Sequence, residues 1–148
     1  MRKIIVSVLN LVNLVLLGIT FGLGTLTAGL DRQGQSIGTY YQLVWPANAA
    51  YFQALNVIGF FALCIAAGLT LFLVVPLSFR KFVSAGNAAL LIFTGVVTLL
   101  VPTIYNQGSA LPVTNQGGLI GMGVLLFVAA AISAFGAVLE FLAEKEAK

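Results

Sequence analysis

The chain has 148 residues, of which 60% are hydrophobic and 7% are charged, with a formal net charge of +3. A soluble domain carries roughly 25% charged residues to solvate its surface, so this composition excludes an ordinary water-soluble fold. The chain has no histidine and one cysteine, which excludes an internal disulfide, and its few basic residues form no run suited to nucleic acid.

Charged residues lie at the N-terminus, at two internal pairs and in the C-terminal tail, and long uncharged stretches separate them. A helix needs about 20 apolar residues to cross a bilayer. The stretches therefore predict an all-α, integral membrane four-helix bundle that forms a single transmembrane domain over residues 1–148. Its helices span about residues 4–29, 54–75, 86–105 and 118–139, with outer loops at 30–53 and 106–117, an inner loop at 76–85 and a tail at 140–148.

The first segment begins like a secretory signal, because Arg2 and Lys3 precede an apolar run. That run exceeds the roughly 7–15 residues of a cleaved signal, which favours a retained helix. Cleavage near residues 27–29, where small residues occur, is the alternative.

A polar stripe follows one side of this helix, since Ser7, Asn10 and Asn13 recur every third residue. An amide that faced lipid would lack hydrogen-bond partners, so the stripe should face protein or water. Its structural interpretation is hydrogen bonding between helices. Its functional interpretation is a polar pathway or a site for a neutral ligand.

Small residues recur at helical spacing in three of the predicted helices, where they would let helix backbones approach closely. They are Gly18, Gly22, Thr25 and Gly29 in the first helix, Ala62 and Ala66 in the second, and Gly117, Gly121, Ala129 and Ser133 in the fourth. We expect them to pack helices within one chain, with dimerisation as the alternative.

The first outer loop is rich in aromatic residues, namely Tyr40, Tyr41, Trp45 and Tyr51. Amphipathic rings of this kind favour the headgroup level of a membrane. We expect the loop to lie at the outer interface and to present its aromatic side chains to partners.

The basic residues predict the orientation. If all four segments cross, one side of the membrane holds Arg2, Lys3, Arg80, Lys81, Lys145 and Lys148, and the other holds Arg32. The positive-inside rule then places both termini in the cytoplasm. We interpret Arg80 and Lys81 as topology signals, and the tail as a solvated continuation of the fourth helix in which Glu144 and Lys148 can pair.

The predicted membrane-spanning segments contain no histidine, aspartate, glutamate, lysine or arginine. They therefore offer no ligand for a metal or haem cofactor and no proton relay, and we expect no enzymatic activity. The favoured function is a small accessory or scaffold subunit that packs against other membrane proteins or itself in a bacterial plasma membrane. The alternative is a pore, channel, carrier subunit or holin-like oligomer for a small neutral or hydrophobic solute.

Overall fold

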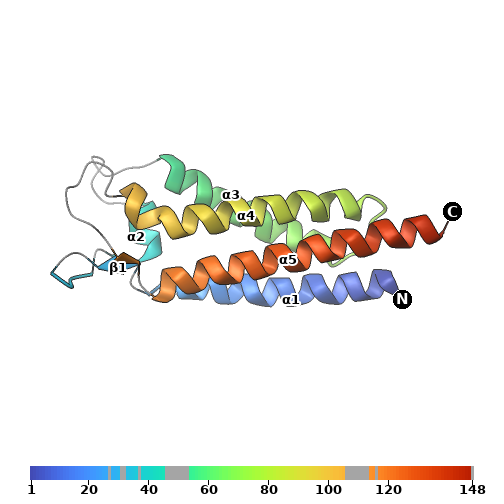
Figure 1. Cartoon of the computed structure of the whole chain (residues 1–148), viewed down its shortest axis with the longest axis horizontal. Helices are drawn as coiled ribbons and strands as arrows, with labels where there is room; N and C mark the ends of the chain where they lie inside the picture. The colour runs from blue at the N-terminus through green and yellow to red at the C-terminus, as the bar shows by residue number, and fades with distance from the viewer. Residues whose placement is uncertain are drawn as a thin grey trace.

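The computed structural model describes residues 1–26, 28–30, 33–36, 38–45, 54–105, 114–115 and 117–147. In chain order the elements among them are α1 (Arg2–Leu23), β1 (Gly29–Leu30), α2 (Tyr40–Val44), α3 (Ala54–Leu73), α4 (Arg80–Tyr105), β2 (Thr114–Asn115) and α5 (Gly117–Glu146). Four of the helices are long, and they run side by side (Figure 1). The predicted all-α four-helix bundle is confirmed.

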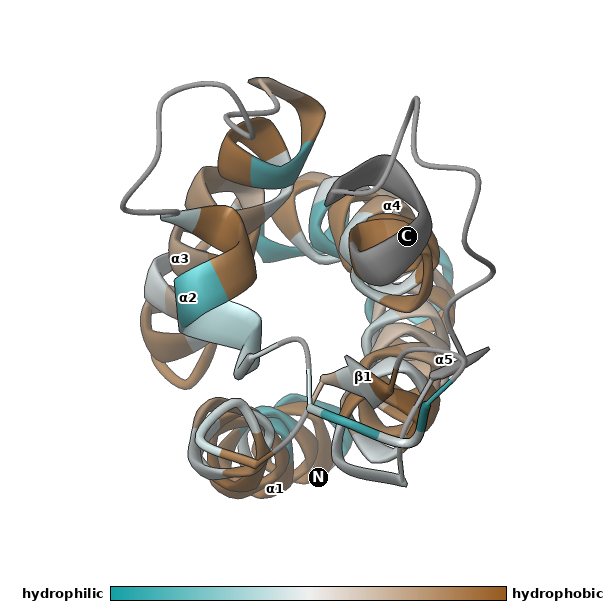
Figure 2. Cartoon of the chain, turned by 90° about the vertical axis from the view of Figure 1, so that its left-hand side faces the viewer, coloured by the Kyte–Doolittle hydropathy of each residue, from teal (hydrophilic) through white to brown (hydrophobic). Residues whose placement is uncertain are grey.

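Both chain ends lie at one end of the bundle, here called the inner end, and α2 and β1 lie at the other, the outer end (Figure 1). Around the bundle axis α1 lies beside α5, α5 beside α4, and α4 beside α3, while α3 meets α1 less extensively (Figure 2). The helix α5 is therefore the most extensive neighbour of α1.

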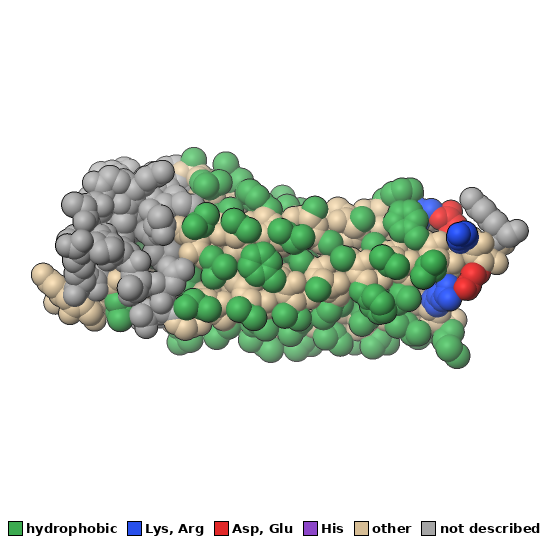
Figure 3. All heavy atoms as spheres, viewed as in Figure 1, with side chains coloured by type: hydrophobic (Ala, Val, Ile, Leu, Met, Phe, Trp, Pro, Cys, Tyr) green, Lys and Arg blue, Asp and Glu red, His purple; other side chains and the backbone are tan. Residues whose placement is uncertain are grey.

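Apolar side chains cover the flanks of the long helices, whereas charged side chains gather at the inner end (Figure 3). Large hydrophobic residues such as Ile4, Phe72 and Phe82 are more than 60% exposed to the surroundings of the chain. All four long helices have the length and hydropathy to cross a bilayer. The protein is therefore a multi-pass membrane protein whose flanks face lipid.

The interior is layered along the bundle axis. Its middle is a cluster of buried apolar side chains built around Leu17, Leu63, Leu91 and Leu126. On α1 this layer lies between Asn13 and Thr20, and on α4 it lies between Asn87 and Thr94, all of them buried. An apolar layer thus separates an inner polar layer from an outer one.

The predicted end of the first helix was wrong, because α1 stops at Leu23 rather than near Gly29. The apolar run continues, but a Cβ on Gly24 would lie 3.0 Å from the Tyr41 ring, and the Thr25 hydroxyl donates to the Gly22 carbonyl. The chain instead forms a turn and then pairs Gly29 and Leu30 with Asn115 and Thr114 as two antiparallel strands.

The predicted start of the third long helix was also wrong, because α4 begins at Arg80 rather than near residue 86. The helix α5 continues past residue 139 to Glu146, as expected for the tail. The prediction placed charged residues in water, but the side chains of Arg80 and Glu140 are buried inside the bundle. The inner connection is accordingly the short turn between Leu73 and Arg80.

The packing of α4 against α5 leaves no room for a side chain at Gly123. A Cβ on Gly123 of α5 would lie 2.5 Å from Cδ2 of Leu99 on α4, far inside van der Waals contact. Gly18 on α1 differs, because a Cβ there would meet nothing within 4 Å.

We predict that Gly123→Ala lowers the free energy of unfolding by about 1–3 kcal/mol, the usual cost of overpacking a filled interior. The matched change Gly18→Ala adds the same methyl group to an open helix surface and should be neutral or stabilising by up to about 1 kcal/mol. Unfolding in mixed detergent micelles, followed by circular dichroism, measures both. Equal destabilisation by the two variants would contradict this packing.

Candidate functional site

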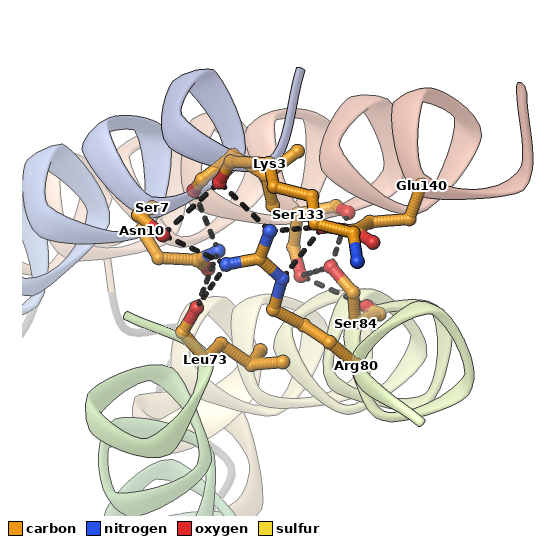
Figure 4. Close-up of polar contacts among 9 residues, drawn as sticks. Lys3, Ser7, Asn10, Leu73, Arg80, Ser84, Ser133 and Glu140 are labelled. Atoms are coloured by element: carbon orange, nitrogen blue, oxygen red, sulfur yellow. Dashed lines mark hydrogen bonds and ion pairs between the residues drawn. The ribbon is translucent and has the colours of Figure 1, made fainter. Parts of the chain in front are cut away.

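Among the described residues, the guanidinium of Arg80, the first residue of α4, makes the largest set of side-chain polar contacts (Figure 4). Its side chain is 0% exposed. Nε donates to Oε1 of Glu140 on α5 at 2.6 Å, and Nη2 contacts the same oxygen. Nη1 donates to Oγ of Ser7 at 2.8 Å, and Nη2 donates to the carbonyl of Lys3 at 2.8 Å, both on α1.

The remaining long helix, α3, joins this cluster through a backbone carbonyl. Nη1 of Arg80 lies 3.4 Å from the carbonyl oxygen of Leu73, the last residue of α3, and Nδ2 of Asn10 donates to the same oxygen at 3.3 Å. Carbonyls at a helix C-terminus have no partner within their own helix, so these donors satisfy an otherwise open group. One guanidinium therefore contacts α1, α3 and α5 from α4.

A second polar contact fixes α4 to α5 one turn further from the inner end. Oγ of Ser84 donates to the carbonyl of Ser133, and Oγ of Ser133 donates to the carbonyl of Ser84, each at 2.9 Å. Such reciprocal bonds require the two backbones to lie close together, which small side chains allow. Ser133 thus joins the two helices by hydrogen bonding as well as by its small size.

The C-terminal extension of α5 is held by two further ion pairs. Glu144 pairs with Lys81 of α4, and Glu146 pairs with Arg2 of α1 at 2.7 Å. The ammonium of Lys81 also lies 4.8 Å from the ring centroid of Phe82. The expected pair of Glu144 with Lys148 falls on a residue outside the described part of the chain.

Four buried asparagines donate hydrogen bonds and leave their side-chain oxygens without a partner among the described residues. Asn13 donates to the carbonyl of Ala129 on α5 at 3.0 Å, and Asn87 donates to the hydroxyl of Thr70 on α3 at 2.9 Å. Asn10 and Asn56 complete the set. Thus Asn10 and Asn13 face protein, while Ser7 is partly exposed and reaches Arg80.

An unpaired buried amide oxygen is costly, at roughly 1–3 kcal/mol each, so these four atoms need an explanation in structure or function. The middle layer is a cluster of apolar side chains, so among the described residues no polar side chain in it connects the asparagines of the inner layer to those of the outer layer. Within a single chain, the two polar layers therefore remain separate.

Among the described residues of the aromatic outer loop, Tyr40 and Tyr41 pack against the bundle and do not point outwards as expected. Tyr40 is 2% exposed and packs between the outer ends of the long helices, together with Leu43 and Val44. Tyr41 donates to the carbonyl of Phe21 at 2.5 Å, which ties α2 to α1. A capping box between Thr39 and Gln42 starts this short helix and satisfies its first amides. The loop therefore closes the outer end of the bundle.

Trp45 is exposed and stacks edge-on against Phe60 and Phe61 of α3, at centroid distances of 6.0 Å and 5.9 Å. Of the described aromatic residues of the loop, Trp45 is the one at the surface. Tyr51 lies outside the described residues. The expectation of an aromatic surface is thus met by Trp45 alone among the described members of that set.

The small residues divide into two groups. Ala62, Ala66, Ala129 and Ser133 are buried between helices, Gly29 is buried in β1, and a Cβ on Gly121 would lie 3.1 Å from Leu23. Gly18, Gly22, Thr25 and Gly117 are instead exposed, and the expected packing within one chain is wrong for them. On α1 the glycines lie on the side of the helix opposite the buried stripe of Asn10, Asn13 and Leu17, so they face lipid.

Among the described residues, no group of three or more histidine, cysteine, aspartate or glutamate side chains could hold a metal ion. The buried charges are engaged with one another. The polar contacts of the described residues therefore join the helices to one another.

Comparisons with protein-family models, with curated proteins and with solved structures found no match to this chain.

We predict that Glu140→Leu lowers the free energy of unfolding by about 3–5 kcal/mol, because it leaves the Arg80 charge buried without a compensating negative charge. The double variant Arg80→Met with Glu140→Leu should recover most of that loss. Glu144→Gln, which breaks an ion pair that is partly exposed, should cost less than about 1 kcal/mol. Unfolding in mixed micelles measures all three, and an equal loss in Glu140→Leu and Glu144→Gln would contradict the role given to Arg80.

Burial raises the pKa of the Tyr40 phenol above its ordinary value of about 10, although a hydrogen bond with Thr98 acts in the opposite direction. The unfolded chain therefore releases this proton first, and stability that is complete below about pH 10 declines as the pH rises further. We predict a smaller decline for Tyr40→Phe than for the wild type in the same micelles. Parallel declines would show that Tyr40 ionises as freely in the folded protein as in the unfolded chain.

Proposed function

We propose that the protein is a non-catalytic accessory or scaffold subunit that binds the transmembrane helix of another membrane protein through the outward face of α1. The observation that carries this proposal is the position of Gly18 and Gly22, four residues apart on the lipid-facing side. A Cβ at either position would meet nothing within 4 Å. Small residues on an open helix face allow a second helix to approach closely.

The interior of the bundle supports the same proposal. Arg80 and Glu140 neutralise one another, the leucine layer fills the middle, and α2 closes the outer end. A bundle whose buried polar and charged groups bind one another is suited to a structural role, in which it holds other proteins in place. We therefore expect no enzymatic activity and no bound cofactor.

The proposed location is a bacterial plasma membrane with the inner end in the cytoplasm. The inner end carries Arg2, Lys3, Lys81 and Lys145, and basic residues accumulate on the cytoplasmic side of spanning segments. Arg32, the basic residue expected on the opposite side, lies outside the described residues.

Partner binding through the outward face of α1 can be tested by mild solubilisation of native membranes and affinity purification. We predict that the wild type recovers a stoichiometric membrane partner or a second copy, and that Gly18→Leu combined with Gly22→Leu loses it. The control Gly68→Leu changes an equally open glycine on α3 and should retain it. A wild-type protein that purifies alone and monomeric, or equal loss in control and test variants, would contradict the proposal.

A second candidate function is a carrier or pore subunit for a small neutral solute, and the unpaired oxygens of the four buried asparagines favour it. The scaffold proposal predicts that liposomes containing the protein take up glycerol no faster than empty liposomes. Uptake that is faster with the wild type and is abolished by Asn13→Leu would establish the carrier function instead.

A further inference from the structure

Two adjoining cavities lie at the inner end, around the turn between α3 and α4. The first has a volume of about 190 Å³ and an apolar lining that includes Leu69, Phe72, Leu77, Phe79 and Val83. Phe72 and Phe79 are both exposed, so this cavity is a groove on the lipid-facing side. It lies on the apolar flank of the bundle next to the inner end.

The second cavity has a volume of about 240 Å³ and a polar lining that includes Lys3, Ser78, Lys81, Glu140 and Glu144. Leu77 lines both cavities, so the polar pocket and the apolar groove adjoin each other. The pocket lies among the charged side chains that mark the headgroup level at this end of the bundle (Figure 3).

The charges that line the pocket do not cancel. Glu140 is engaged by Arg80, and Glu144 is engaged by Lys81. The ammonium of Lys3 makes no ion pair with any described residue, and its side chain is exposed. The pocket with its paired partners therefore retains one uncompensated positive charge, beside the hydroxyl of Ser78.

We propose that the pocket and the groove form one binding site for an anionic phospholipid of the cytoplasmic leaflet. The phosphodiester binds Lys3 and Ser78, because a single negative charge compensates the unpaired ammonium. One acyl chain lies in the groove between Phe72 and Phe79, where it buries apolar surface that the bundle leaves open. A soluble anion would fill the pocket alone and leave the groove unused.

Lys3 can be tested without disturbing the buried cluster, since Arg80 binds its backbone carbonyl and not its side chain. In native mass spectrometry of the full chain released from micelles, we predict that phosphatidylglycerol is retained in preference to phosphatidylcholine. Lys3→Gln should weaken phosphatidylglycerol binding about five-fold, the factor expected for one lysine at an anionic surface. Lys145→Gln removes the same charge at the same end, from outside both cavities, and should leave binding unchanged.

The groove is tested by a second pair of variants. Leu69→Trp places a large side chain in the groove and should displace the lipid, whereas Leu71→Trp changes an exposed residue of the same helix that does not line it. Equal retention of the two lipids, equal effects of Lys3→Gln and Lys145→Gln, or retention in Leu69→Trp would each overturn the proposal. Thermal stabilisation by inorganic phosphate equal to that by phosphatidylglycerol would overturn it too, in favour of a free-anion site.

Discussion

A guanidinium that is fully buried inside a helical bundle must be satisfied by the protein around it. The structure meets this requirement for Arg80 with one carboxylate, one hydroxyl and two backbone carbonyls. Because these acceptors come from α1, α3 and α5, the relative positions of all four long helices at the inner end are fixed by one residue. The hydrogen bonds between Ser84 and Ser133 and the close approach at Gly123 add further contacts between α4 and α5.

The bundle could be predicted from the sequence because lipid imposes a simple rule, that long uncharged stretches become helices. The same rule misplaced the helix ends, since it assigned Arg80 and Glu140 to water. One signal was available: Arg80, Ser84 and Asn87 recur at spacings of four and three, which places a charge on the polar side of α4. The partner of Arg80 could not be predicted, because Glu140 lies 60 residues further along the chain and no local pattern specifies which helices are neighbours.

Which small and aromatic residues are exposed could not be predicted from the sequence, for a related reason. Gly18 and Ala66 look alike as members of helical stripes, and only the arrangement of helices makes one face lipid and the other face the core. Tyr40 and Trp45 belong to one loop, yet the loop turns the first inwards and leaves the second outside. The outward glycines and the closed interior together favour a protein that works through its surface.

The position of Glu140 so late in the chain has a consequence for biogenesis. As the ribosome extends the polypeptide, α4 reaches the insertion machinery while the carboxylate that neutralises its arginine has not yet been synthesised. The contacts of α5 with α1 and α4 can therefore form only after the three earlier spans have been synthesised. Nascent chains that terminate early would expose a lone cation to the bilayer, a defect that membrane proteases can recognise.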